Sequence, residues 1–156
     1  LGHVGDNVGS AERDSHLQDP SLFYTDPKMA RDFVEKTKVD ALAIAVGTAH
    51  GAYKLPPKLD FERIKAIALQ VEVPLVLHGG SGLTDEDFRK AIACGIQKVN
   101  IFTDINTAAA MAEYEAYCAG SRGLTDLIPA AVEAVREETK KKMRLFASEG
   151  KGNICL

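Results

Sequence analysis

Two histidines in this sequence stand where apolar runs end, and each is followed by glycine. His50 precedes Gly51, and His78 follows the run Leu75–Leu77 and precedes Gly79. Neutral imidazoles suit Zn²⁺, and a catalytic zinc site takes three protein ligands and leaves one position open. Glycines leave backbone N–H groups uncovered, so an anion can approach them. The pattern favours metal and phosphate binding, although a single strand-end histidine is more often a hydrogen-bonded polar residue.

The residues around His78 have the pattern of a strand, a loop and a helix in succession. The run that ends at Leu77 is short and β-branched enough for a buried parallel strand. Thr84, with Asp87 three residues later, has the pattern of a helix N-cap with an acidic first turn. The intervening segment Gly79–Gly82 therefore lies between a strand end and a helix start, a position that suits an anion.

The composition is that of an ordinary globular protein. The chain has 156 residues, of which 46% are hydrophobic and 26% charged, and its net charge is −3. This charge gives no field that would attract nucleic acid, and no apolar segment reaches the roughly 20 residues that cross a bilayer. The three cysteines lack metal or redox spacing and fit a reducing cytoplasm. The basic run Lys140–Lys142 is interpreted as part of a solvated helix face.

Helical and strand patterns alternate along the chain. Residues 1–25 are polar and glycine-punctuated and are expected to form a mobile loop. Leu42, Ile44 and Val46 share one face of a strand whose other face carries alanines, which suits a barrel wall backed by helices. The expected elements are helix 27–37, strand 40–46, helix 60–71, strand 74–77, helix 85–94, strand 98–102, helix 103–119 and a C-terminal helical segment, 124–150. Asp26, before Pro27, and Asp60 are expected to cap the helices that follow them.

This order predicts a parallel α/β sheet within a single domain, residues 1–156. Helices that alternate with buried strands imply right-handed crossovers. Three strands are too few to close a barrel, and an open three-stranded sheet would expose two edges. We therefore expect the C-terminal half of a (β/α)8 TIM barrel with an additional C-terminal helix. An open doubly wound sheet is the alternative.

The predicted strands end in polar turns that would share one face of a parallel barrel. Active sites of such barrels lie at this face, and phosphate often binds in the loops after the last two strands. Those loops are Gly79–Gly82 and Asn100–Thr103. His50 and His78 end neighbouring strands and could share one metal ion. The other two histidines fall in the N-terminal loop and are interpreted as bystanders.

Four motifs in this order and spacing give the sequence a family resemblance. They are Gly47-Thr-Ala-His-Gly-Ala-Tyr-Lys54, Pro57-Lys-Leu-Asp-Phe61, Val73-Pro-Leu-Val-Leu-His-Gly-Gly-Ser-Gly82 and Lys98-Val-Asn-Ile-Phe-Thr103. They resemble the class II, zinc-dependent ketose-bisphosphate aldolases, a group that includes fructose-bisphosphate and tagatose-bisphosphate aldolases. The resemblance extends over almost the whole chain, to about Lys151.

The resemblance implies a role for each matching residue. His50 and His78 match two of three zinc ligands, and the third ligand and the catalytic acid are expected in an N-terminal half that is absent from this sequence. A monovalent cation, Na⁺ or K⁺, is implied near the carbonyls around Gly51 and Gly79. The residues that match the binding of dihydroxyacetone phosphate are Gly51, Gly79, Gly80, Ser81, Asn100, Ile101, Phe102 and Thr103.

The implied activity is reversible aldol cleavage of a ketose 1,6-bisphosphate, most readily fructose 1,6-bisphosphate, to dihydroxyacetone phosphate and glyceraldehyde 3-phosphate. Zn²⁺ would absorb the charge that develops beside the ketone, and the phosphate would supply remote binding energy. A tagatose bisphosphate or an inositol-pathway ketose is an alternative substrate. The family also implies a cytoplasmic homo-oligomer, a dimer or tetramer.

Two other functions compete with this interpretation. In a Schiff-base aldolase, Lys98 would be the nucleophile, but it precedes Asn100 by two residues and would lie deeper in its strand. Alternatively, this polypeptide alone is an inactive half-barrel that lacks the N-terminal catalytic residues.

Overall fold

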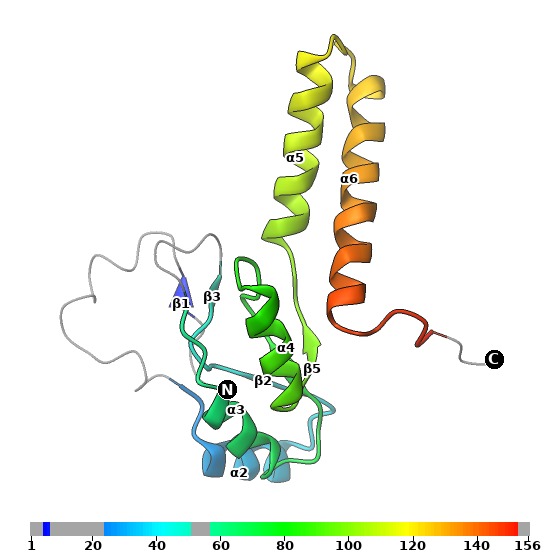
Figure 1. Ribbon diagram of the computed structural model, residues 1–156. Helices are drawn as coiled ribbons and strands as arrows, with labels where there is room; N and C mark the ends of the chain where they lie inside the picture. The colour runs from blue at the N-terminus through cyan, green and yellow to red at the C-terminus, as the bar shows by residue number, and fades with distance from the viewer. Residues whose placement is uncertain (1–4, 7–23, 51–56, 153–156) are drawn as a thin grey trace, which may run out of the picture. The chain divides into compact units, whose positions relative to one another are not determined.

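The computed structural model describes residues 5–6, 24–50 and 57–152, and for 5–6 and 49–50 it describes the backbone alone. The chain divides into two compact units, Leu1–Ile101 and Phe102–Leu156. Their elements are labelled in Figure 1. Among the described helices, none combines the length and apolar composition that crossing a bilayer requires.

A three-stranded parallel sheet forms the centre of the first unit. It consists of β2 (Leu42–Ile44), β4 (Leu75–Leu77) and β5 (Ile96–Val99), in the order β2-β4-β5. Ile44 lies beside Leu77, and Leu77 lies beside Val99, so the three strands end at the same level. The alternation of parallel strands with helices confirms the predicted α/β class.

A second, shorter parallel pair joins the N-terminal segment to the residues before Gly51. β1 (Gly5–Asp6) pairs with β3 (Ala49–His50), so that the backbone of Asp6 lies beside that of His50. The sequence predicted only loops here, and at these four residues that prediction is wrong. A pair of two-residue strands is too short to show an alternating pattern.

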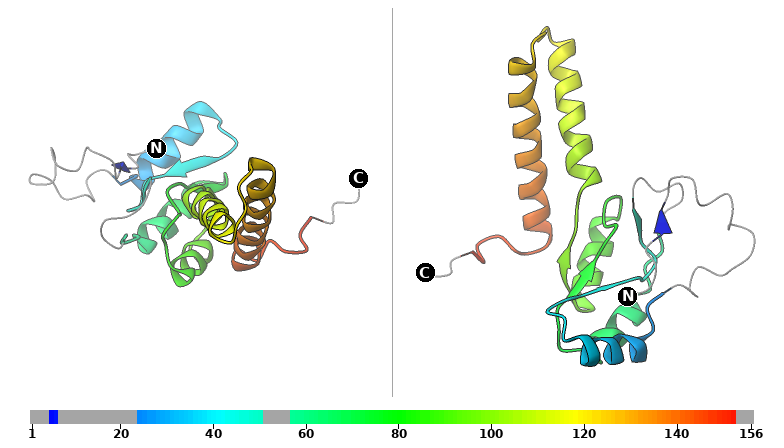
Figure 2. Two further views of the ribbon diagram at one scale, coloured as in Figure 1. Left: turned by 90° about the horizontal axis from the view of Figure 1, so that it is seen from above. Right: turned by 180° about the vertical axis from the view of Figure 1, so that it is seen from behind.

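Three helices accompany the sheet in the first unit (Figures 1 and 2). α2 contacts α3, α3 contacts α4, and α4 contacts β5. Each begins with a side-chain cap, as the sequence predicted: Asp26, Asp60 and Thr84 accept hydrogen bonds from the first backbone N–H groups. The helices are α2 (Pro27–Thr37), α3 (Phe61–Ala68) and α4 (Asp85–Ala93).

The core of the first unit lies between this sheet and these helices. The predicted face of the first strand, Leu42, Ile44 and Val46, is buried, as are Ile64 and Ile67 from α3. Burying one such side chain stabilises the fold by about 1.5–3 kcal/mol. The strand ends are therefore held by apolar packing. The largest fully buried apolar side chains are Phe88, Ile44, Ile64, Ile67, Leu75, Leu77, Ile96 and Val46.

The second unit is a helical hairpin. α5 (Thr103–Cys118) and α6 (Leu124–Leu145) lie side by side and run in opposite directions (Figures 1 and 2). No residue of α5 is buried, and the one buried residue of α6 is Lys142. The interpretation of the basic run as a solvated face is therefore wrong for Lys142, because its ammonium pairs with Asp104 across the hairpin.

Several element ends differ from their predicted positions. The strand expected at 40–46 occupies 42–44, and the helical segment expected to reach residue 150 ends at Leu145. The helix expected to reach residue 71 ends at Ala68, and the strand expected at 98–102 occupies 96–99. Gly95 accounts for the early start of β5, because its φ of +120° turns the chain directly from α4 into the strand. A Cβ on Gly95 would lie 2.6 Å from the Cβ of Ala68, so α3 also packs closely against this turn.

The cap at the start of α4 can be tested by substitution. The Thr84 hydroxyl accepts a hydrogen bond from Asp87 N at 3.1 Å, and the Asp87 carboxylate accepts one from Thr84 N at 3.2 Å. We expect Thr84→Ala to lower the free energy of unfolding by about 1 kcal/mol in urea denaturation. Thr84→Ser should keep most of the stability, because serine caps equally well. Equal losses in the two variants would contradict this role of the hydroxyl.

Candidate functional site

The ends of β4 and β5 bring His78 and Asn100 together. Asn100 N donates to Leu77 O at 3.0 Å, which places the two residues after these strands side by side. The side-chain amide Nδ2 of Asn100 lies 3.3 Å from His78 Nδ1. Both residues are half-buried. Two residues that the sequence predicted on neighbouring strand ends are therefore in contact.

Asn100 is placed to control the protonation of the His78 ring. Its amide carries a donor and an acceptor, so Nδ2 can donate to an unprotonated Nδ1, or the turned amide can accept from Nδ1–H through Oδ1. A lone pair stays free for a metal, on Nε2, only in the second arrangement, because in the first the lone pair of Nδ1 already accepts the hydrogen bond. Histidine ligands of metals commonly use their other N–H for such a hydrogen bond, which fixes the tautomer and the ring orientation.

The glycine loop after His78 folds tightly against the core. Gly79 and Gly82 have φ of +66° and +90°, and Leu83 N donates to Gly80 O at 3.3 Å. A Cβ on Gly80 would lie 3.0 Å from Val99 Cγ1. The loop backbone can approach β5 this closely because Gly80 has no side chain.

Ser81 is buried within this loop, at 7% exposure. It directly follows Gly79 and Gly80 in the turn that begins at His78. The structure therefore brings Gly79, Gly80 and Ser81 into one turn between the end of β4 and the cap of α4. A turn of this kind presents backbone N–H groups and a hydroxyl, which are donors that suit a phosphate.

A second glycine turn leads from β2 toward His50. Gly47 has φ of +103°, and a Cβ there would lie 2.3 Å from Lys58 O and 2.8 Å from Tyr24 Oη. Only glycine fits this position without displacing backbone. The next residue, Thr48, is buried, and its Oγ1 has no hydrogen-bond partner among the described residues.

Arg63 ties the start of α3 to the segment before α2. Its Nε donates to Asp60 Oδ2 at 3.0 Å and its Nη1 donates to Thr25 O at 3.3 Å, while the guanidinium lies 5.5 Å from the centre of the Tyr24 ring. Thr25 N in turn donates to Ala45 O, and Ala45 N donates to the Thr25 hydroxyl oxygen, each at 2.9 Å, directly after β2. The sequence analysis recognised Asp60 as a cap but missed this cluster, since no local spacing signals it.

The remaining predicted site residues are not among those that the structure brings together around His78. The side chain of His50 and all of Gly51 lie outside the described residues. Ile101 ends the first unit, whereas Phe102 and Thr103 begin the second, at the start of α5. The shared metal ion and the complete phosphate site therefore stay predictions.

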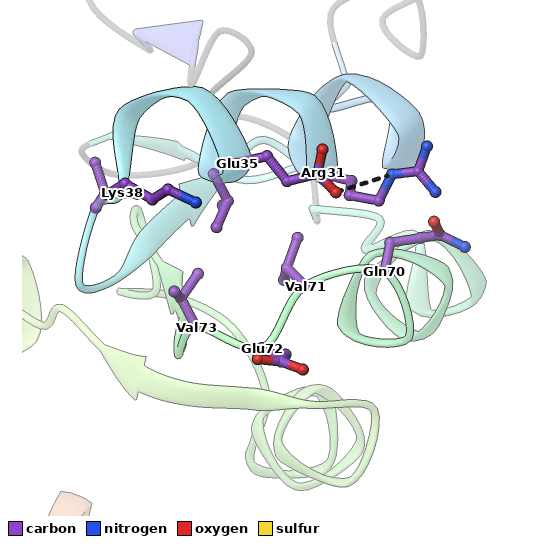
Figure 3. Close-up of a pocket in the computed structure, with 9 residues that line it drawn as sticks. Arg31, Glu35, Lys38, Gln70, Val71, Glu72 and Val73 are labelled. Atoms are coloured by element: carbon purple, nitrogen blue, oxygen red, sulfur yellow. Dashed lines mark ion pairs between the residues drawn. The ribbon is translucent and has the colours of Figure 1, made fainter.

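A pocket of about 420 Å³ lies at the other ends of the strands (Figure 3). It is formed by the last turns of α2 and by residues 70–73, which precede β4. Arg31 pairs with Glu35 at its rim, with Nε and Oε1 3.6 Å apart. The candidate site at His78 is at the carboxyl ends of the strands, so this pocket is not part of it.

Comparison with known proteins identifies the family. The family model described as fructose-bisphosphate aldolase class-II matches residues 1–151. The chain belongs to the class-II fructose-bisphosphate aldolase family. This match confirms the predicted family.

Individual relatives agree with this assignment. YdjI of Escherichia coli K12, described as uncharacterised, is 41% identical over 151 residues, 97% of this chain and 51% of YdjI. The crystal structure of the YdjI aldolase has a TM-score of 0.78 at 42% identity and covers 85% of this chain and 49% of its own. A proposed fructose-1,6-bisphosphate aldolase from Coccidioides immitis has a TM-score of 0.79 at 31% identity, over 96% of this chain and 51% of its own.

The chain thus spans about half the length of these class-II aldolase relatives. Over that half, the structural matches confirm the predicted α/β fold of an aldolase half-barrel.

Proposed function

We propose that the complete protein catalyses reversible, zinc-dependent aldol cleavage of a ketose bisphosphate. Fructose 1,6-bisphosphate is the first candidate, with dihydroxyacetone phosphate and glyceraldehyde 3-phosphate as products. The observation that carries the proposal is the 3.3 Å contact between His78 and Asn100 at a strand end, directly before a glycine turn, in a class-II aldolase chain. A tagatose bisphosphate or a related ketose is the alternative substrate.

The donor set at this strand end fits zinc. Imidazole nitrogen is a preferred zinc ligand, and the partner of His78, Asn100, is the kind of neighbour that orients a ligating ring. We propose His50 and His78 as ligands and leave the third ligand unassigned. When bound, the metal would supply a Lewis acid that polarises the ketone oxygen and stabilises negative charge on it.

The residues of this chain would bind and orient the substrate. The N–H groups of Gly79 and Gly80 and the Ser81 hydroxyl are proposed to hold phosphate, together with Gly51 and the segment Asn100–Thr103. The start of α5 supports this, because its N-cap residue is Phe102, which offers no side-chain hydrogen bond to the first turn of the helix. A phosphate held in this way fixes the ketone relative to His78.

Thr48 supports the proposed monovalent cation. Its buried Oγ1 has no hydrogen-bond partner among the described residues, so it supplies an oxygen that a hard cation accepts. We keep Na⁺ or K⁺ as a proposed cofactor near the carbonyls around Gly51 and Gly79, and we propose a cytoplasmic dimer or tetramer from the family resemblance.

The Schiff-base alternative is less favoured by the position of Lys98. Lys98 is an exposed residue inside β5, beside Val76 of β4, and it precedes the strand end at Val99. A Schiff-base lysine is favoured by a desolvated pocket, and Lys98 is exposed.

The proposed reaction is tested by metal removal. The complete protein should cleave fructose 1,6-bisphosphate in a coupled assay, and EDTA should lower the rate by at least about 100-fold, because the Lewis acid is lost. Added Zn²⁺ should restore the rate. The control is borohydride treatment in the presence of the ketone substrate. An EDTA-resistant rate with a covalent adduct at Lys98 would contradict the metal mechanism. Cleavage by the complete protein but not by the 156-residue chain would favour the inactive half-barrel.

A further inference from the structure

Lys142 carries a buried charge, and it is the one residue of α6 that is buried. It lies in the last turns of α6, and its side chain is 11% exposed. Its ammonium lies 2.5 Å from Asp104 Oδ2 and 3.5 Å from Glu138 Oε1. Burying an ammonium costs free energy unless it is paired, so this lysine is held in place by its two carboxylates.

Asp104 lies in the first turn of α5, directly after Thr103. A carboxylate at this position is favourable for the helix itself, because it complements the positive end of the helix dipole. The same charge would oppose a phosphate bound at the same N–H groups, since like charges at short range are little screened by salt. The ammonium of Lys142 neutralises that carboxylate from the opposite helix.

Glu138 pairs with two neighbouring lysines of its own helix. Its carboxylate lies 3.5 Å from Lys142 and, through its other oxygen, 3.7 Å from Lys141 Nζ. Lys141 is 63% exposed and Lys142 is 11% exposed. The neighbouring lysines therefore carry the same charge and share Glu138, but only Lys142 has a described ion pair with the first turn of α5.

We propose that Lys142 is a positioning residue for phosphate binding. It cancels the charge of Asp104 and fixes that carboxylate against α6, so that the start of α5 stays attractive to a phosphate. This inference rests on the proposed function, which places the phosphate of the substrate at Asn100–Thr103. Lys142 itself does not touch the substrate.

The test compares Lys142→Met with Lys141→Met in the complete protein. Both variants remove one positive charge from the same stretch of α6. For Lys142→Met, we expect the KM for fructose 1,6-bisphosphate and the Kd of inorganic phosphate, measured by competition, to rise about tenfold, while kcat changes by less than about twofold. Lys141→Met should leave all three constants within about twofold of wild type.

Two further variants separate charge from packing. Lys142→Arg keeps the charge and should bind phosphate nearly as wild type does. Lys142→Met combined with Asp104→Asn removes both charges and should restore most of the phosphate affinity, which a purely structural role would not allow. The inference is overturned if Lys142→Met behaves as Lys141→Met does, or if the double variant binds no better than Lys142→Met. A wild-type protein that binds no phosphate would overturn the proposed function as well.

Discussion

His78→Ala is expected to lower kcat/KM for fructose 1,6-bisphosphate by at least about 100-fold, because the variant removes a proposed metal ligand. His78 follows the buried end of β4 and contacts Asn100, so its imidazole has a fixed position. The variant should also lose zinc, which metal analysis of the purified protein would measure. The fold should persist, since the half-buried ring is not part of the apolar core.

The matched control for this prediction is His16→Ala. His16 is one of the two histidines in the segment that the sequence predicts as an N-terminal loop, both interpreted as bystanders, and it lies outside the described residues. Zinc content and rate should stay near wild type in this variant. Full zinc occupancy in His78→Ala, or a comparable loss in His16→Ala, would show that the metal is held elsewhere.

Gly47→Ala is expected to destabilise the protein by about 3 kcal/mol, from strain at positive φ together with overpacking. The added Cβ would lie 2.3 Å from the backbone oxygen of Lys58, which cannot move aside as a flexible side chain can. The 2.8 Å approach to Tyr24 Oη adds to the conflict. Urea denaturation of the variant and the wild type would measure the difference in unfolding free energy.

Gly120→Ala is the control that separates backbone strain from steric overlap in this loss of stability. Gly120 has φ of +116°, close to the +103° of Gly47, but a Cβ there would meet nothing within 4 Å. We expect it to cost about 1 kcal/mol, from backbone strain alone. Similar losses in the two variants would mean that the contact with Lys58 contributes nothing, and that the turn before His50 is not sterically fixed.

Helix starts were predictable from the sequence because capping is local chemistry. Asp26 before Pro27, and Thr84 with Asp87, each bind the first backbone N–H groups of a helix within three residues. The local sequence alone therefore locates these two helix starts. The end of α3 was less predictable. The chain leaves the helix at Ala68 and turns through Gln70, whose N–H donates to Ile67 O at 2.8 Å. Ala68, where the helix ends, packs closely against Gly95, which is 27 positions away in the sequence and is not signalled by any local pattern.

The candidate site was predictable where it follows from strand order. His78 and Asn100 each come directly after a strand, and parallel neighbours end at one level, which brings the two side chains together. The pairing of β1 with β3 was not predictable, because two residues show no period. The burial of Lys142 was not predictable either, since it depends on Asp104, 38 positions earlier in the sequence and on the opposite helix.

The central claim is that one divalent ion binds the imidazoles of His50 and His78 beside a phosphate-binding turn. Zinc-edge anomalous diffraction from crystals of the complete protein, grown with dihydroxyacetone phosphate, tests it most directly. We predict a single anomalous peak within about 2.0–2.1 Å of a nitrogen of each ring, with the phosphate against Gly79–Ser81. A peak that contacts neither ring, or His50 and His78 directed into separate surroundings, would contradict the account.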